Sequence, residues 1–213
     1  MAVRADLNLS LDGIAVTSDQ TPENPFGDDW GRLVAAYTGT RTFQQRVFHD
    51  ESGSGTTGID DRYAQEYFEG IGAEIMGAGM FGFHNFPDDP NWRGWWGDEP
   101  PFHYPVLVLT QTPRPPIEFE NGTRFDFRNV APLEALEEAR GLAGEEDIRI
   151  GGGASVVRDF LRAGLIDRLH VALAPIVIGR GTRLWDDLHQ LEDGFAVSSE
   201  LAESGVVHVT FRR

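Results

Sequence analysis

The feature that most constrains the fold is a run of three glycines at residues 151–153, because the segments on its two sides differ in hydrophobic pattern. Before the run, Ile148 and Ile150 flank a polar residue, which is typical of a short strand. After it, apolar residues recur at helical spacing up to Leu161, and residues 169–178 form a second apolar run. The order strand, glycine turn, helix, strand favours an α/β protein.

Glycines between a strand and a helix suit a ligand that carries phosphate. They accept positive φ angles and leave the backbone open to close approach. The helix start adds free N–H groups and the positive end of the helix dipole. A tight turn without a ligand explains the same run equally well. Two other phosphate motifs are excluded, since G-x-G-x-x-G would need a glycine at Val156 and the P-loop needs a lysine, which the chain lacks.

The remaining sequence alternates strands with helices and predicts a single domain over residues 1–213. Apolar runs predict strands at residues 3–9, 73–76 and 105–110. Helical spacing predicts helices at residues 30–37, 40–49 and 131–142. Two hairpins are expected, one pairing residues 117–119 with 124–127 and one pairing 195–201 with 206–211. We therefore expect an α/β fold with a central mixed, mostly parallel sheet, flanking helices and a C-terminal antiparallel hairpin.

Composition narrows the classes of function. The formal net charge is −16, so nucleic acid and anionic membranes are not expected partners. All 18 basic residues are arginine and there is no cysteine, which excludes a catalytic lysine, a cysteine nucleophile, disulfides and thiolate metal sites. The six histidines form no H-E-x-x-H pattern, and no metal is expected. No segment resembles a membrane span or a secretory signal, so a cytoplasmic protein is expected.

The segment GGGASVVRDFLRAGLIDRLHVALAPIVIGRGTRLW, residues 151–185, resembles the C-terminal signature of the dihydrofolate reductase-like superfamily. It is most similar to the branch that includes the reductase domain of bacterial riboflavin biosynthesis. In that branch a Gly-Gly run, a G-L-[IV]-D-[ER]-L turn and a strand ending in P-[IV]-[VIL]-[IL]-G-x-G follow one another. The S-L-D-G of residues 10–13 resembles the turn that ends the first strand throughout the superfamily. The resemblance implies the three-layer fold of that superfamily. The bifunctional riboflavin enzyme is excluded, since the chain has no deaminase signature.

The resemblance implies an NAD(P)H-dependent reductase that transfers hydride to a small pterin-like or ribosylamino-pyrimidine substrate, or to another carbonyl or imine. NADPH is the expected cofactor and NADH the alternative, because Ala78 replaces the family's phosphate-binding arginine. Arg114 is a candidate to supply the missing charge. The alternative functions are a catalytically repurposed nucleotide-binding protein and a purely structural dimer. A homodimer is expected in each case, with residues 171–178 or the tryptophan-rich segment 83–101 at the contact.

By the same resemblance, several parts of the chain contact the ligands. The expected cofactor-binding residues are Ala15, Gly77, Ala78, Gly79, Met80, Thr110, Gln111, Gly151, Gly152, Gly153, Ala154, Ser155 and Val156, and the expected substrate-binding residues are Ser10, Asp12, Trp30 and Phe81. Asp28 and Asp29 are the candidate proton donors, since a carboxylate beside an apolar pocket can have a raised pKa, although acidic residues here also suit a helix cap. Asp60 and Asp61 match a family motif, G-G-T-T-G-[IV]-D-D, and are interpreted as caps of the next helix.

The segment 83–101 holds three tryptophans and four prolines and is too irregular for a strand or a helix. A packed loop or a dimer contact is favoured over a lid whose Arg93 would meet an acidic substrate group. His170 and His208 lie in strand patterns and are interpreted as structural residues.

Overall fold

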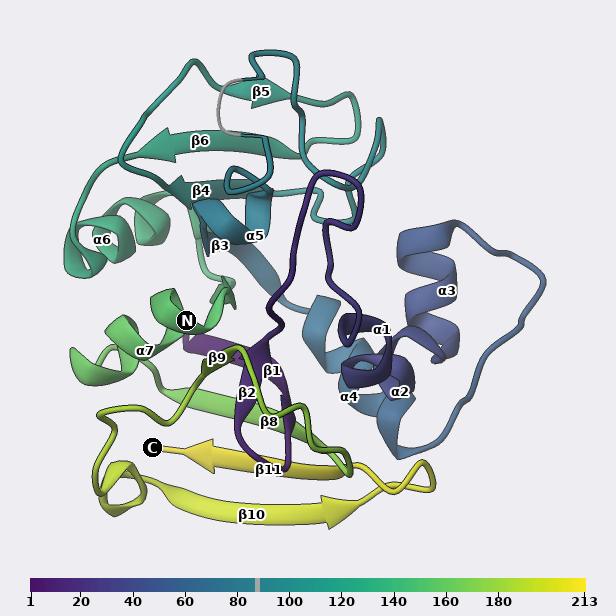
Figure 1. Cartoon of the computed structure of the whole chain (residues 1–213). Helices are drawn as coiled ribbons and strands as arrows, with labels where there is room; N and C mark the ends of the chain where they lie inside the picture. The colour runs from purple at the N-terminus through teal and green to yellow at the C-terminus, as the bar shows by residue number, and fades with distance from the viewer. Residues whose placement is uncertain (87–88) are drawn as a thin grey trace.

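The computed structural model describes residues 1–86 and 89–213, and within them the main element is a sheet of nine strands (Figure 1). The strands are β1 (Val3–Ser10), β3 (Ile71–Gly77), β4 (Pro105–Leu109), β5 (Ile117–Glu118), β6 (Arg124–Arg128), β7 (Asp147–Gly152), β8 (Arg168–Ala174), β10 (Ala196–Leu201) and β11 (Val207–Arg212). Their order is β10-β11-β8-β1-β7-β3-β4-β6-β5, and the six strands from β8 to β6 run parallel. Antiparallel hairpins close the two edges, and a second small sheet pairs β2 (Ile14–Val16) with β9 (Thr182–Arg183).

Helices cover both faces of this sheet and give three layers (Figure 1). On one side, α6 (Pro132–Ala143) and α7 (Ala154–Arg162) pack on β3 and β7. On the other side lie α1 (Trp30–Leu33), α2 (Ala35–Thr38), α3 (Arg41–Phe48) and α4 (Ile59–Phe68), while α5 (Ala78–Phe81) follows β3 and η1 (Leu191–Gly194) precedes β10. Local signals start these helices: the Thr40 hydroxyl accepts a hydrogen bond from the Phe43 N–H, and a proline opens α6.

The core lies where the helix layers meet the central strands. Ile75, Leu107, Ile148 and Ile150 have no exposed surface, as expected for parallel strands covered on both faces. A second, aromatic cluster around Phe81 joins α5 to the outer strands. The two clusters hold the carboxyl ends of β7, β3 and β4 beside one another, where a cavity opens.

The architecture confirms the predicted α/β fold, with its mixed sheet, flanking helices and C-terminal hairpin. The helix expected at residues 30–37 is interrupted, because Val34 leaves helical geometry between α1 and α2. The interpretation of Asp60 and Asp61 as helix caps is wrong. Gly58 occupies the cap position of α4, and both aspartates are buried within the first turn.

The apolar run at residues 171–178 is divided between sheet and surface. Residues 171–174 belong to β8, which pairs with β1 on one edge and β11 on the other. This part therefore has no free strand edge, and the expected dimer contact stays a prediction. Beyond it, Val177 is exposed.

The tryptophan-rich segment is an irregular packed loop, as its sequence predicted. Its residues 83–86 and 89–101 contain no helix or strand, and Pro87 and Asp88 lie outside the described residues. The indole N–H groups of Trp92 and Trp95 donate to the backbone carbonyls of Phe81 and Met80 at 2.8 and 2.9 Å. These bonds fix the segment on α5.

Candidate active site

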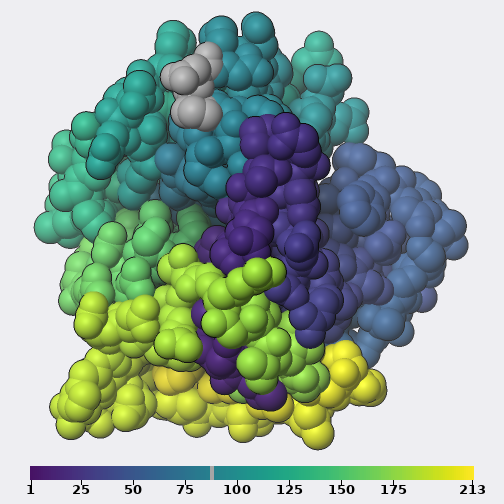
Figure 2. All heavy atoms as spheres, in the orientation of Figure 1, coloured from purple at the N-terminus to yellow at the C-terminus, as the bar shows by residue number. Residues whose placement is uncertain are grey.

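A cavity of about 890 Å³ opens at the carboxyl ends of β3, β4 and β7. Open α/β sheets bind their ligands at this edge, and the volume suits a small molecule or a cofactor. The loop of residues 17–29 lies beside the mouth, where Phe26 stacks on Trp30 at 4.7 Å and contacts Trp95 at 4.9 Å. Figure 2 shows this purple loop lying against the teal part of the chain.

The glycine run forms one wall of the cavity. A side chain at position 151 would place its Cβ 1.9 Å from the Glu74 Oε1 atom, and Gly152 has a φ of +125°. Gly153 then occupies the cap position of α7, and no side chain caps that helix. Among the described residues nothing accepts a hydrogen bond from the N–H groups of Ala154, Ser155 or Val156, and these three residues line the cavity.

A second stretch of open backbone faces the same space. Gly77, Ala78, Gly79 and Met80 line the cavity after β3, and a Cβ at Gly79 would meet only the His84 ring, at 3.7 Å. Two backbone walls made mostly of glycine and alanine, one of them at the start of a nine-residue helix, fit an elongated ligand that carries phosphate groups. The residues present therefore fit a dinucleotide cofactor.

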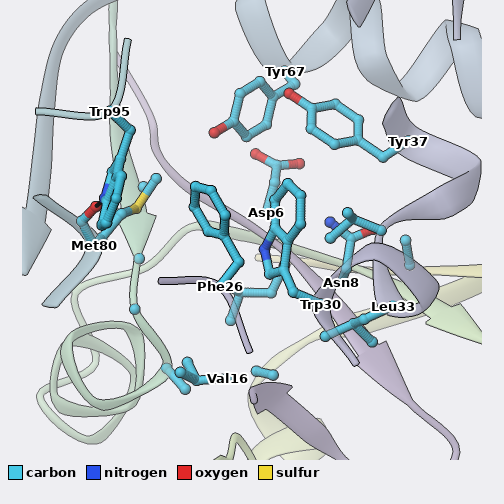
Figure 3. A pocket seen from close by; sticks show the side chains of 18 of the residues that line it. Asp6, Asn8, Val16, Phe26, Trp30, Leu33, Tyr37, Tyr67, Met80 and Trp95 are labelled. Atoms are coloured by element: carbon cyan, nitrogen blue, oxygen red, sulfur yellow. Dashed lines mark hydrogen bonds between the residues drawn. The ribbon is translucent and has the colours of Figure 1, made fainter. Parts of the chain in front are cut away.

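The inner part of the cavity is lined by aromatic rings with a few polar groups (Figure 3). Phe26, Trp30 and Leu33 supply apolar surface, while Asp6 and Asn8 project from β1 beside Tyr37 and Tyr67 (Figure 3). Burial raises the pKa of Tyr67 to about 12, and burial together with Tyr67 raises the pKa of Tyr37 well above its usual value. Both phenols therefore keep their protons at neutral pH and can donate hydrogen bonds.

Asp6 belongs to a line of hydrogen-bonded side chains along one side of the cavity. Its Oδ1 atom lies 3.1 Å from Nδ1 of His170, whose Nε2 lies 2.9 Å from Nδ1 of His208. The line ends at Asp60, where the His208 Nε2 atom lies 2.9 Å from Oδ1. Burial acts to raise the pKa of Asp6, but the hydrogen bond and charge of His170, with two arginines, lower it overall.

The structure gathers most of the expected cofactor residues in this cavity. The predicted residues that line it are Ala15, Trp30, Gly77, Ala78, Gly79, Met80, Gly151, Gly152, Gly153, Ala154, Ser155 and Val156. The predicted residues outside its lining are Ser10, Asp12, Asp28, Asp29, Phe81, Thr110 and Gln111. Phe81 is fully buried in the aromatic core, and Gln111 is exposed beyond β4.

The polar residues left outside have local partners instead. The Ser10 hydroxyl donates to Asp12, which also accepts from the N–H groups of Ile178 and Gly179, so this pair fixes the turn after β1. The hydrogen bonds from Ser10 and Ile178 lower the pKa of Asp12 to about 2. Asp28 and Asp29 also bind local partners outside the cavity lining. The Asn24 amide donates to Asp28 at 2.7 Å, and the Arg32 guanidinium donates to Asp29 at 2.5 Å.

No arginine lies among the described residues that line the cavity. Arg114 sits over the rings of Phe83 and Phe127 at 4.8 and 4.7 Å and donates to the carbonyl of Trp92. It therefore holds the tryptophan-rich segment and does not replace the arginine that is absent at Ala78. Arg93 packs on Phe119, again outside the cavity.

Sequence reasoning missed Asp6, Asn8, Tyr37, Tyr67 and the role of the two histidines in the cavity. One signal was available: Asp6 and Asn8 interrupt the apolar residues of the first strand, and His170 interrupts an apolar strand. Polar residues at inward positions of buried strands need partners, and those partners are often functional. Their identity depended on the strand order, which local patterns do not give.

The sheet order, the helix layers and the cleft at the strand ends define a dihydrofolate reductase-like α/β fold. A solved structure of a putative riboflavin biosynthesis protein from Shewanella sp. PV-4 aligns over 100% of this chain and 99% of its own, with a TM-score of 0.58 and 19% identity. RibD from Acinetobacter baumannii aligns over 99% of this chain and 57% of its own, with a TM-score of 0.51 and 17% identity. At such identities the likeness concerns the fold.

The chain belongs to the RibD C-terminal domain family, whose sequence model matches residues 2–208. This confirms the branch that the glycine-rich signature indicated. The uncharacterized protein YyaP of Bacillus subtilis (strain 168) is 31% identical over 94 residues. That match covers 44% of this chain and 48% of YyaP, so it spans about half of the relative.

Within residues 1–86 and 89–213, no group of three or more histidine, aspartate or glutamate side chains is arranged to hold a metal ion. In the same residues no helix combines the length and apolarity required to cross a membrane.

Proposed function

We propose that the protein is a reductase that takes hydride from a nicotinamide dinucleotide and delivers it to a small acceptor with a C=N or C=O bond. The observation that carries the proposal is the cavity with two open backbone walls, one of which presents the free N–H groups of residues 154–156. Membership in the RibD C-terminal domain family supports it. When bound, the cofactor supplies the hydride, and the chain positions it and excludes water.

The inner part of the cavity favours a flat heterocycle with polar edges as the hydride acceptor. Trp30 and Phe26 offer ring faces for stacking, while the Asn8 amide and the phenols of Tyr37 and Tyr67 offer hydrogen bonds at the rim of such a ring. A pterin-like or ribosylamino-pyrimidine substrate has this combination of flat faces and polar edges.

The absence of an arginine among the described residues that line the cavity affects the preference between NADPH and NADH. A 2′-phosphate is usually selected by a bidentate arginine, and such charged hydrogen bonds contribute about 1.5–3 kcal/mol. Because no described lining residue is an arginine, we expect NADH and NADPH to bind with affinities within about tenfold of each other, a difference of about 1.4 kcal/mol or less.

The test is a substitution that stabilises helix α7 but weakens the binding of a cofactor phosphate at its start. Ser155→Asp puts a carboxylate in the exposed first turn of α7, where it stabilises the helix dipole but repels a cofactor phosphate. We expect the Kd for NADPH and NADH, measured by nicotinamide fluorescence at low salt, to rise at least about tenfold. Leu133→Asp, an equivalent change in the exposed first turn of α6 and outside the cavity, should leave both Kd values unchanged.

The outcomes separate the parts of the proposal. No binding of either dinucleotide to the unaltered protein overturns the cofactor assignment. Unchanged binding by Ser155→Asp means that the phosphates lie elsewhere in the cavity. Binding without oxidation of NADPH by any dihydropterin, ribosylamino-pyrimidine or aldehyde would instead make the chain a nucleotide-binding protein of this fold.

A further inference from the structure

The line of side chains from Asp6 to Asp60 has a feature that the cofactor site does not explain. Two imidazoles lie in series between two carboxylates. The four residues come from β1, β8, β11 and α4 and are brought together by the sheet order, which places Asp6 directly opposite His170. His170, His208 and Asp60 are 5, 3 and 8% exposed, so water is largely excluded from the bonds between them. All four line the cavity.

The number of protons in this line follows from its geometry. Three hydrogen bonds join the four groups, at 3.1, 2.9 and 2.9 Å, and each bond requires one proton. An ionised carboxylate can only accept. If both ends are ionised, three of the four ring nitrogens must carry protons, and one imidazole is therefore doubly protonated.

The same bonds decide which ring holds the extra proton. Asp60 lies in the first turn of α4, where the helix dipole favours a carboxylate, so the His208 Nε2 atom is a donor to it. Burial, together with the charges of His170 and Arg62, lowers the pKa of His208 against the opposing effect of Asp60, so this ring prefers the neutral state. Its Nδ1 atom is then an acceptor, and both nitrogens of His170 must donate.

The surrounding charges agree with this distribution. Arg168 and Arg149 favour the ionised form of Asp6, and Arg62 opposes a positive charge on His208. Tyr63 lies flat against both imidazoles, with ring centroids 4.3 Å from His170 and 4.1 Å from His208 and planes within 5° of parallel. Its ring face suits a cationic imidazole and keeps the two rings coplanar.

We propose that Asp60, acting through His208, holds His170 doubly protonated beside Asp6, and that Asp6 passes this proton to the acceptor as it is reduced. This inference rests on the proposed function. The acceptor carbon gains hydride from C4 of the reduced nicotinamide, which becomes oxidised, and the electron pair of the C=N or C=O bond moves to nitrogen or oxygen. That atom gains the proton that leaves His170 Nδ1 by way of Asp6, and His170 is left neutral until solvent reprotonates it after product release.

The first test measures the protonation of His170 without any ligand. Histidine-selective ¹H–¹⁵N spectra, assigned with a His170→Gln variant, should show two ring N–H groups on His170 and one, at Nε2, on His208 near neutral pH. In Asp60→Asn the amide can donate to His208 Nε2, so the tautomer of His208 should reverse and His170 should keep only its Nδ1 proton. Asp61→Asn is the matched control, because this neighbouring buried carboxylate accepts from Thr42 and Gln65 and lies outside the line.

Three outcomes of this test would overturn the inferred protonation of His170. A singly protonated His170 in the unaltered protein overturns the inference, and so does a His170 signal that is identical in the unaltered protein and in Asp60→Asn. A change in Asp61→Asn as large as that in Asp60→Asn would mean that the effect is a general disturbance of α4, which also overturns it.

The second test concerns proton delivery and keeps it separate from cofactor binding. With a dihydropterin as probe acceptor, Asp6→Asn should slow NADPH oxidation about 100-fold near neutral pH, the lower end of the usual range for loss of a general acid. Asp60→Asn, which acts only through His208, should have a smaller effect of about tenfold, below that range. NADPH Kd should stay within about twofold in both, because neither carboxylate lies at the glycine walls. Unchanged rates in both variants overturn the delivery role. If the unaltered protein does not bind NADPH, the proposed function is overturned, but the spectroscopic result on His170 is unaffected.

Discussion

Two buried charged clusters occupy neighbouring positions in the sheet, and they behave differently because of the side chains that carry the positive charge. In the first, Arg149 on β7 pairs with Glu74 on β3, and both side chains have no exposed surface. In the second, His170 and His208 lie between Asp6 and Asp60 along the cavity. The first is sealed from the cavity, whereas every member of the second lines it.

Hydrogen bonds within the protein surround Arg149 and the Oε2 atom of Glu74. The Nε atom of Arg149 donates to Glu74 Oε2 at 3.0 Å and its Nη1 atom donates to the Tyr67 carbonyl at 2.7 Å. The Tyr104 hydroxyl donates to the same Glu74 oxygen at 3.2 Å. Burial alone would lower the pKa of Arg149, but Glu74 and the nearby tyrosines raise it well above its usual value. The guanidinium therefore stays protonated at physiological pH, and we interpret the pair as structural.

Both clusters bury charge, but only one lines the cavity, so buried charge does not by itself indicate a functional site. An arginine with fixed protons stabilises one arrangement of strands. Two imidazoles in series can change their protonation without moving a heavy atom, and these two line a cavity. The difference between the clusters can be tested by removing charge from each.

The largest effect is expected at the sealed pair. Glu74→Leu leaves Arg149 buried without a partner and should lower the free energy of unfolding by about 3–5 kcal/mol, measured by urea denaturation. The double variant Glu74→Leu/Arg149→Met should recover most of this loss, because no charge remains. Asp6→Asn should cost only about 1–2 kcal/mol, because the asparagine oxygen can still accept a hydrogen bond from His170 Nδ1. Equal losses in the two single variants would contradict the distinction between the clusters.

A smaller effect is expected at the ring that covers the two histidines. Tyr63→Leu removes the stacked ring and should lower the free energy of unfolding by about 1 kcal/mol. Tyr63→Phe keeps the ring and loses only a weak 3.5 Å contact of the hydroxyl with Glu200, so its stability should match the unaltered protein. If Phe and Leu at this position are equivalent, stacking contributes nothing to the histidine line.

The smallest effect is a slope of stability with pH. Because burial lowers the pKa of His208, the unfolded chain binds more protons than the folded one below about pH 6.5, so stability should fall as the pH decreases from there toward about 5. His208→Gln should flatten part of this slope in urea unfolding series. Burial also lowers the pKa of His84, which accounts for a remaining slope of the same sign. An identical slope in the variant would show that His208 titrates normally.

The parts of the site that could be predicted were those fixed by local pattern. The glycine run, the helix after it and the open stretch at residues 77–80 all line the cavity, as the family signature implied. The expected proton donors Asp28 and Asp29 lie outside its lining, and their carboxylates accept hydrogen bonds from Asn24 in the loop and Arg32 on α1. Loop side chains have no periodic pattern from which their direction could be inferred.

The sequence by itself determined the α/β class, the alternation of strands and helices, and the glycine turn, because each depends on residues close together in the chain. Only the tertiary structure decided which polar residues meet. His170 contacts Asp6 across 164 positions and His208 contacts Asp60 across 148. Such pairs depend on the order of β1, β8 and β11 in the sheet, which no local pattern encodes. A buried polar residue shows from sequence that it needs a partner, and the fold alone selects that partner.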